Sequence, residues 1–488
     1  MSDSLFDTAG QPISAKRNLS ALTTIAAWIM VAALVLAPWA FGSRPYFWSA
    51  LLSTLLLLAG LLWAFGLWRE RRRPNVPGWY LLGLAFLSVF MWVGLLNPRS
   101  VYDPVLDRFF PSPVFIAAFP STVDATNSFP LAFSLTGILV ALAIAADLSC
   151  LPQWRRRLIA AMALTGFSVI VSGLLLKANL TPRIGDYLRH RPWALGDTFG
   201  PFDYHGNAGS FINLVLPAMA LQTGFATSLG LRGFWLGVLY FGYIGALVNT
   251  SRAALVLAIL SLPAIIWIVA LGWKQAPLSS RPVGRRPWII AGILMIMMLA
   301  VALLLSYGGS KSVLRFKTIR NEVSAPWYPR YLQSKAAWEM AAAHPWFGGG
   351  IGSYKLLAQH SSIREYWFAP KYRPGQPFTV LGYTHNDYLQ TLAEWGWFGT
   401  AAWSIVIGAA LADLWTFMKQ SRMTVPIAIA TTIALTTVFL HAVVDCPLQI
   451  PALQLYTAIY LGIAATCATR LHHASCDAPA QTSISAPF

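Results

Sequence analysis

The chain alternates between apolar stretches long enough to cross a bilayer and short polar connections, with one long polar interruption. A hydrocarbon core about 30 Å thick requires roughly 20 apolar residues in a helix. Uncharged stretches of that size predict about twelve transmembrane helices, at residues 20–42, 46–68, 78–96, 129–146, 158–176, 207–229, 233–250, 253–273, 288–306, 396–415, 424–444 and 451–469. The pattern therefore predicts an all-α, polytopic integral membrane protein with one large external loop that contains short helices.

The long interruption, residues 308–395, holds the largest concentration of polar residues in the chain. Each buried, unpaired polar group costs several kcal/mol in hydrocarbon, so a membrane protein gathers such groups where water or substrate requires them. Residues 330–343 carry apolar residues at helical spacing, which predicts an amphipathic helix on the membrane surface. The loop closes with Tyr-Thr-His-Asn-Asp-Tyr-Leu-Gln at residues 383–390, and we expect the chemistry there.

These patterns divide the chain into five regions. They are an N-terminal transmembrane region (1–128), a central one (129–307) with an external basic loop at 177–206, the large external loop (308–395), a C-terminal transmembrane region (396–470) and a cytoplasmic tail (471–488). The first apolar stretch is too long for a signal peptide and lacks a convincing cleavage site, so we expect it to remain as an anchor.

Composition and charge agree with this interpretation, since 56% of residues are hydrophobic and 11% are charged. Basic clusters such as 71–73, 155–157 and 285–286 share one side of the membrane if the N-terminus is cytoplasmic, and the positive-inside rule then places both termini inside and the long loop outside. The net charge of +17 is thus largely a topology signal, and nucleic-acid binding is not expected. Among the cysteines only Cys446 faces outward, so no intrachain disulfide is expected.

Two groups of external arginines are not explained by topology. Arg183, Arg189 and Arg191 lie in the loop at 177–206, and Arg252 stands alone at the outer end of an apolar stretch. The planar guanidinium suits phosphate oxygens, so these arginines are typical of a diphosphate clamp. The alternative is that they extend to lipid headgroups or pair with nearby carboxylates.

His385 precedes a second helical stretch within the closing segment of the loop. The positive end of the helix dipole disfavours a protonated imidazole, so His385 is expected to be neutral and able to accept a proton. A hydrogen-bonded structural role is the alternative. The glycine run at 348–352 predicts a tight turn, and it lacks the Lys-Ser/Thr ending of a phosphate-binding loop.

Several motifs together resemble the O-antigen ligase and polymerase superfamily. They are Ser-Arg-Ala-Ala at 251–254, His-Pro-Trp-Phe-Gly-Gly-Gly-Ile-Gly-Ser-Tyr at 344–354, His-Asn-Asp-Tyr-Leu-Gln-Thr-Leu-Ala-Glu-Trp-Gly at 385–396 and Gly-Pro-Phe-Asp-Tyr-His-Gly-Asn at 200–207. The resemblance covers residues 195–415 well and the remainder by hydropathy alone. His205-Gly206-Asn207 departs from the Asn-rich pair that relatives often show, which implies a different acceptor preference.

The resemblance implies a GT-C type glycosyltransferase of the bacterial inner membrane. Such enzymes pass a glycan from undecaprenyl diphosphate to an acceptor sugar, such as the core of lipid A, with no nucleotide sugar, cofactor or metal. By position, Arg252 resembles the arginine that contacts the donor diphosphate, and His385 resembles the histidine at the reaction centre. One of the arginines at 183, 189 and 191 resembles a second phosphate ligand. Asn386, Asp387, His205 and Asn207 are expected to bind the acceptor or support the loop.

The chemistry expected from these residues is an inverting displacement, in which arginines stabilise the departing diphosphate and His385 takes the proton of the acceptor hydroxyl. No Asp-x-Asp pair occurs in the chain, in agreement with metal-independent transfer. The sequence does not separate a ligase from a polymerase of repeat units. A transporter of the lipid-linked saccharide is the alternative from a different functional class. It is disfavoured because the sequence shows no internal repeat and no charge near the middle of a predicted span.

Overall fold

The computed structural model describes residues 19–178, 198–275, 329–363, 382–420 and 425–476, apart from positions 104 and 107. Within these residues nine helices are long and apolar enough to cross a membrane. They are α1 (Ala21–Trp39), α2 (Tyr46–Arg69), α3 (Gly78–Leu96), α4 (Ala125–Ser149), α5 (Pro152–Lys177), α7 (His205–Phe225), α8 (Leu229–Val248), α9 (Arg252–Gln275) and α14 (Asp387–Gln420). The apolar helix α15 (Val425–His441) and helix α16 (Pro451–Cys476) complete the bundle.

These helices confirm the predicted all-α, polytopic membrane fold. Eleven of the predicted stretches correspond to α1 to α5, α7 to α9 and α14 to α16, and the remaining one, residues 288–306, lies outside the described residues. The predicted arginines at 183, 189 and 191 also lie outside them.

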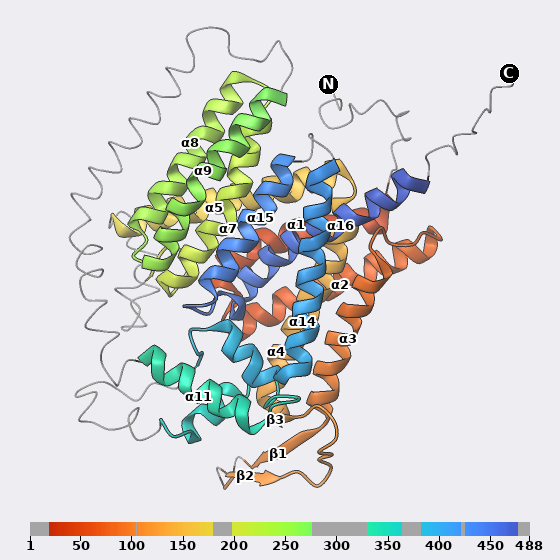
Figure 1. Ribbon diagram of the computed structural model, residues 1–488, viewed down its shortest axis with the longest axis vertical. Coiled ribbons are helices and arrows are strands. Elements are labelled where there is room, and N and C mark those ends of the chain that lie inside the picture. Colours follow the sequence, from red (N-terminus) through yellow and green to blue (C-terminus); the bar gives the residue numbers. More distant parts are fainter. Residues whose placement is uncertain are drawn as a thin grey trace, which may run out of the picture.

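Glycine allows neighbouring helices to approach closely within the bundle. A Cβ on Gly272 of α9 would lie 2.6 Å from the backbone of Gly224 on α7, and one on Gly462 of α16 would lie 2.8 Å from Ala145 on α4. Small residues are favoured at membrane helix contacts because they allow such close packing. In Figure 1, α8 and α9 form one flank of the bundle and α2 and α3 the opposite flank.

Helix α14 is broken at Gly396, where φ is 62° and ψ is −169°. A Cβ at this position would lie 2.5 Å from the backbone of Trp346, so a side chain is excluded by contact as well as by conformation. The glycine run that begins at Gly348 packs against this break, since the Gly349 and Gly350 amides donate to the carbonyls of Ala393 and Glu394. The predicted tight turn therefore binds the broken part of α14 through backbone hydrogen bonds.

Helix α11 (Pro329–Ala343) confirms the predicted amphipathic helix, and short turns α12 (Tyr354–Leu357) and η5 (Ala358–His360) follow it. The apolar face of α11 carries Leu332, Ala336 and Met340, which are buried together with Ala393 of α14. The protein therefore covers the face that the sequence analysis assigned to the membrane surface.

A three-stranded sheet between α3 and α4 was not predicted from the sequence. Strand β1 (Pro98–Asp103) pairs antiparallel with β2 (Arg108–Pro111), with Val101 opposite Phe110, and parallel with β3 (Thr122–Asp124). Arg99 of β1 donates to the Gly348 carbonyl at 2.9 Å and to His344 Nε2 at 2.8 Å. The sheet and α11 thereby lie together at one end of the bundle (Figure 1), called here the site end.

Candidate active site

His385 occupies a tight turn immediately before α14, at the site end of the bundle. Its φ of 55° is in the left-handed region, which is uncommon for a non-glycine residue. The turn is closed by Thr384, whose hydroxyl accepts from the Asn386 amide at 2.9 Å. Asn386 Oδ1 in turn accepts from the Leu389 amide at 3.0 Å and so satisfies one of the free amides at the start of the helix. Asn386 thus supports the turn that presents His385.

The imidazole of His385 is held by the buried carboxylate of Asp445. Nδ1 lies 2.8 Å from Asp445 Oδ1, and the side chains of His385 and Asp445 are 26% and 5% exposed. Asp445 belongs to the connection between α15 and α16, 60 positions further along the chain. The second oxygen, Oδ2, accepts a hydrogen bond of 3.0 Å from the Tyr204 hydroxyl, just before α7. Two distant connections therefore meet at His385.

Cations and donors around Asp445 keep this carboxyl ionised. Arg330 Nη2 at the start of α11 and His441 Nε2 each lie 3.8 Å from Oδ2, and the Cys446 amide donates to Oδ1 at 3.0 Å. Burial alone would raise the pKa of Asp445, but the hydrogen bond with His385 and the positive charge of Arg330 hold the pKa below its usual range. Burial raises the pKa of Tyr204, so the phenol stays protonated and donates.

This arrangement suits His385 to proton transfer. A carboxylate at Nδ1 selects the tautomer with a proton on that nitrogen, which leaves the lone pair on Nε2. The same carboxylate stabilises the imidazolium that forms when Nε2 takes a proton. The ring is also partly exposed, so a hydroxyl group can reach it.

The start of α7 links His385 to the predicted phosphate-binding arginine. The ring of Tyr204 lies 5.8 Å from that of His385 and 4.6 Å from that of His205, measured between centroids. The His205 carbonyl accepts from Asn249 Nδ2 at 3.0 Å, three residues before Arg252. Arg252 opens α9 and is half-buried. Ring contacts and one hydrogen bond therefore lead from His385 to Asn249, in the segment that precedes Arg252.

The remaining predicted residues have structural contacts of their own. Asp387 is buried, and its two oxygens accept from the Leu448 amide at 2.8 Å and from Gln449 Nε2 at 3.0 Å. The Asp387 amide donates to the Ala442 carbonyl, so this residue fastens α14 to the connection that carries Asp445. Asn207 is buried in the first turn of α7, and its Oδ1 has no hydrogen-bond partner among the described residues.

Sequence analysis missed Asp445 and Arg330. Arg330 donates from Nη1 to the Val444 carbonyl at 2.7 Å and approaches the Tyr204 hydroxyl at 3.5 Å through Nη2. It therefore joins α11 to the same cluster as His385. No local pattern marks either residue, because each becomes part of the site through contacts between distant segments.

His385, Asp445 and Cys446 place one potential metal-ligand atom each within 4.8 Å of one another. The donor set fits a metal poorly. Asp445 is already surrounded by an arginine, a phenol donor and a backbone amide. Burial also raises the pKa of the Cys446 thiol, which disfavours the thiolate that a metal requires. We therefore assign these residues to a hydrogen-bonded cluster.

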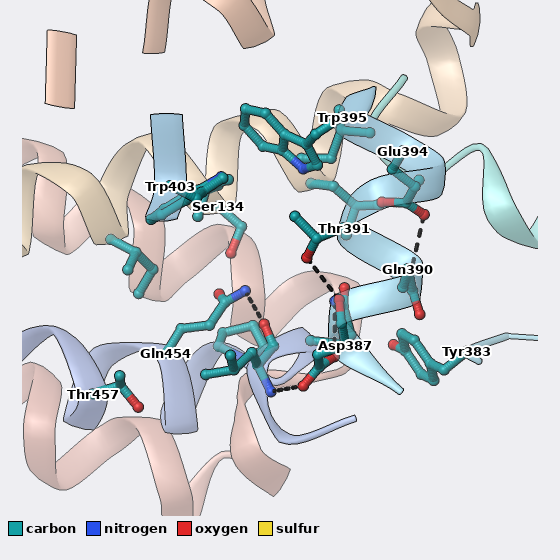
Figure 2. A pocket seen from close by; sticks show the side chains of 18 of the residues that line it. Ser134, Tyr383, Asp387, Gln390, Thr391, Glu394, Trp395, Trp403, Gln454 and Thr457 are labelled. Atoms are coloured by element: carbon teal, nitrogen blue, oxygen red, sulfur yellow. Dashed lines mark hydrogen bonds between the residues drawn. The ribbon is translucent and has the colours of Figure 1, made fainter. Parts of the chain in front are cut away.

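A pocket of about 550 Å³ is lined by residues that neighbour this cluster in the sequence, although His385 and Asp445 are not themselves part of the lining. Its walls come from α2, α4, both halves of α14 and α16, with Lys355 of α12 and Phe439 of α15. Figure 2 shows Asp387, Gln390 and Glu394 on one helix with Gln454 and Thr457 on another. Tyr383 and Asp387, which flank His385 in sequence, both line it. The pocket therefore reaches the segment that presents the imidazole.

Comparison with known proteins agrees with the resemblance inferred from the motifs. Residues 234–404 match a family model described as O-Antigen ligase. The matched region includes Arg252, Arg330 and His385, whereas Asp445 and Tyr204 lie outside it. A search of curated proteins found no match to the chain.

Proposed function

We propose that this chain, a member of the O-antigen ligase superfamily, moves a glycan from undecaprenyl diphosphate to an acceptor sugar at the outer face of the bacterial inner membrane. The observation that carries the proposal is the His385–Asp445 pair, which lies at one end of a bundle of membrane helices and in which His385 is flanked in sequence by residues that line a pocket. A partly exposed imidazole backed by a buried carboxylate is the arrangement expected of a general base.

His385 acts on the acceptor. Its Nε2 takes the proton of the acceptor hydroxyl as the oxygen attacks the anomeric carbon of the donor sugar. Asp445 keeps Nδ1–H oriented and stabilises the positive charge that the ring acquires. Tyr204 and Arg330 hold Asp445 in place from two other segments of the chain.

Arginines act on the donor. As the new glycosidic bond forms, the bond between the anomeric carbon and the diphosphate oxygen breaks, and the diphosphate leaves with the electron pair. Fixed cations stabilise this developing charge, and the guanidinium fork of Arg252 suits it. One of Arg183, Arg189 and Arg191 supplies a second phosphate ligand. Attack opposite the leaving group inverts the anomeric centre, and no metal is needed because the arginines carry the charge.

The proposed transfer at the outer face of the membrane also sets the orientation of the protein in the bilayer. The site end faces the periplasm, both termini face the cytoplasm, and the isoprenoid of the donor stays in the bilayer. A polymerase that joins repeat units through the same displacement is the alternative function, and its acceptor is another lipid-linked saccharide.

The proposal is tested with purified full-length protein in proteoliposomes that contain an undecaprenyl-diphosphate-linked glycan and a candidate acceptor. Glycan transfer with stoichiometric release of undecaprenyl diphosphate, inversion at the new linkage and full activity in a chelator are expected. Movement of the intact lipid-linked saccharide across the bilayer without cleavage of the diphosphate bond would instead identify a transporter.

A further inference from the structure

A run of apolar residues outside the membrane helices is exposed at the site end. It begins in β2 and covers residues 109–120 without a charged side chain. Every residue from 113 to 119 is exposed, and the large side chains among them are Val114, Phe115, Ile116 and Phe119. Contiguous exposed apolar surface of this kind marks a site of contact with a protein or a membrane. Residues 113–119, called here the apolar loop, therefore form a surface that requires a partner.

The apolar loop is fixed beside the end of α3. Asn97, the C-terminal cap of α3, is buried, and its Oδ1 accepts from the Ile116 amide at 2.8 Å. Its Nδ2 donates to the Ile116 carbonyl at 2.8 Å and to the Pro120 carbonyl at 3.0 Å. Three hydrogen bonds from one side chain therefore hold the loop at the point where α3 ends.

The end of α3 coincides with the boundary of the hydrocarbon. A helix rises 1.5 Å per residue, so the 19 residues of α3 span about 28 Å, close to the hydrocarbon thickness of about 30 Å. Exposed apolar side chains recur at helical spacing at Leu82, Phe86, Val89 and Leu96, which marks a lipid-facing stripe. Leu96 is 78% exposed and carries this stripe to the last residue of the helix. The apolar loop therefore begins where a lipid-facing surface stops and extends it.

The loop is also braced by the residue that contacts the glycine run. Arg99 Nε donates to Ser121 Oγ at 2.8 Å, and its guanidinium lies 6.0 Å from the centre of the Phe115 ring. The Arg99 carbonyl accepts from the Ser112 amide at 2.9 Å. Because Arg99 also donates to the Gly348 carbonyl, the loop and the segment that binds the broken part of α14 share one residue. The exposed side chains of the loop are thus presented by a backbone that the protein holds in place.

Lipid fits this surface better than a second protein chain does. The rim of a protein interface is polar and forms hydrogen bonds, whereas residues 109–120 offer no charged side chain. A backbone deep in hydrocarbon would leave amide groups unpaired, which excludes a deep position for an irregular loop. A shallow position satisfies both requirements, because the side chains reach the acyl chains while the backbone stays at the level of the headgroups.

We propose that residues 113–119 insert their apolar side chains into the leaflet at the site end, beside α3, as an interfacial anchor. The partner is the acyl-chain region of the surrounding phospholipids. The inference depends neither on glycosyl transfer nor on the compartment that the site end faces. Because Arg99 joins the loop to the glycine run, the anchor also sets the depth of the site end relative to the headgroups.

Photocrosslinking of the purified full-length protein in phospholipid vesicles tests this placement. In one preparation p-benzoylphenylalanine replaces Ile116, and in the control it replaces His360, an exposed residue of η5, which packs against α11 and α12. Irradiation is expected to add the mass of one phospholipid at position 116 and none at position 360. A crosslink between two copies of the chain at position 116, no adduct there, or equal lipid adducts at both positions overturns the proposal.

The depth of the loop is measured with the unsubstituted protein. The vesicles contain a phospholipid with a diazirine either in its headgroup or in an acyl chain near the ester. The acyl-chain probe is expected to label the peptide that contains residues 113–119. Labelling of this peptide by the headgroup probe alone would place the loop outside the hydrocarbon and contradict the insertion.

A charge in the loop should expel it from the leaflet. Ile116→Asp should lower acyl-chain labelling of residues 113–119 at least about fivefold, because a carboxylate is costly within lipid. Val105→Asp, at the exposed turn between β1 and β2, is the matched control and should leave the labelling unchanged. Equal labelling of the wild type and a folded Ile116→Asp variant contradicts the proposal. If that variant fails to fold, the two probes on the unsubstituted protein decide the assignment.

Discussion

Replacement of Asp445 by Asn isolates the contribution of its charge. Asn keeps the size of the side chain and one oxygen for the 2.8 Å contact with His385 Nδ1, but removes the negative charge that stabilises the imidazolium. Tyr204 also donates to Asp445, and in the variant it meets either an amide oxygen or an amide nitrogen. The variant therefore alters the orientation and the electrostatics of His385 without removing the imidazole.

The expected loss follows from the strength of the interaction. A hydrogen bond to a charged group contributes about 1.5–3 kcal/mol, and each 1.36 kcal/mol in an activation barrier changes a rate about tenfold. Asp445→Asn should therefore lower kcat about 10- to 150-fold. Donor affinity should hardly change, because the proposed diphosphate ligand Arg252 lies on another segment.

The assay is glycan transfer in proteoliposomes at several donor concentrations, with thermal unfolding to verify the fold. Glu339→Gln on α11 is the matched control, since it also neutralises a carboxylate near the site end but contacts Ser362 and Lys335 rather than His385. A folded Asp445→Asn variant with kcat within about twofold of the wild type would refute the proposed role of the carboxylate. A loss expressed entirely in donor KM would refute it as well.

Three further outcomes are expected. Arg252→Ala should abolish transfer while leaving membrane insertion intact, and Arg252→Lys should restore little because a point charge cannot reproduce the guanidinium fork; near-normal transfer by the Ala variant excludes the clamp. Gly396→Ala should destabilise the protein by more than about 1 kcal/mol through strain at positive φ and contact with Trp346. The control is Gly408→Ala on the same helix, where the added methyl group would have no neighbouring atom within 4 Å, and this variant should be neutral or slightly stabilising in thermal unfolding. Ser361→Cys should react with an impermeant thiol reagent from the periplasmic side, and labelling from the cytoplasmic side alone would reverse the proposed topology.

The membrane helices could be predicted from the sequence because hydrophobic length is a local property. The stretch predicted at 78–96 coincides with α3, and that at 46–68 differs from α2 by one residue. The boundary placed at residue 396 falls on the glycine where α14 breaks. In each case the signal lies within one contiguous segment, where composition alone determines whether a helix can cross hydrocarbon.

The partners of His385 could not be predicted in the same way. Asp445 lies in a different connection, and Arg330 begins α11. An aspartate at the end of an apolar helix has no pattern that separates it from an ordinary polar connection. The sheet at 98–124 was missed for a related reason, because its short strands are defined by hydrogen bonds between segments and by the contacts of Arg99 with the glycine run.

The role of His385 is tested most directly by comparing turnover with donor binding in its own variants. His385→Asn suits this purpose because Asn tolerates the left-handed conformation found at this position, and His360→Ala, an exposed histidine of η5, is the control. We predict that His385→Asn and His385→Ala lose turnover by about two to four orders of magnitude and still bind the lipid-linked donor with wild-type affinity. Folded variants that transfer glycan at near wild-type rate, or that fail to bind donor, would contradict the assignment of His385 as the base.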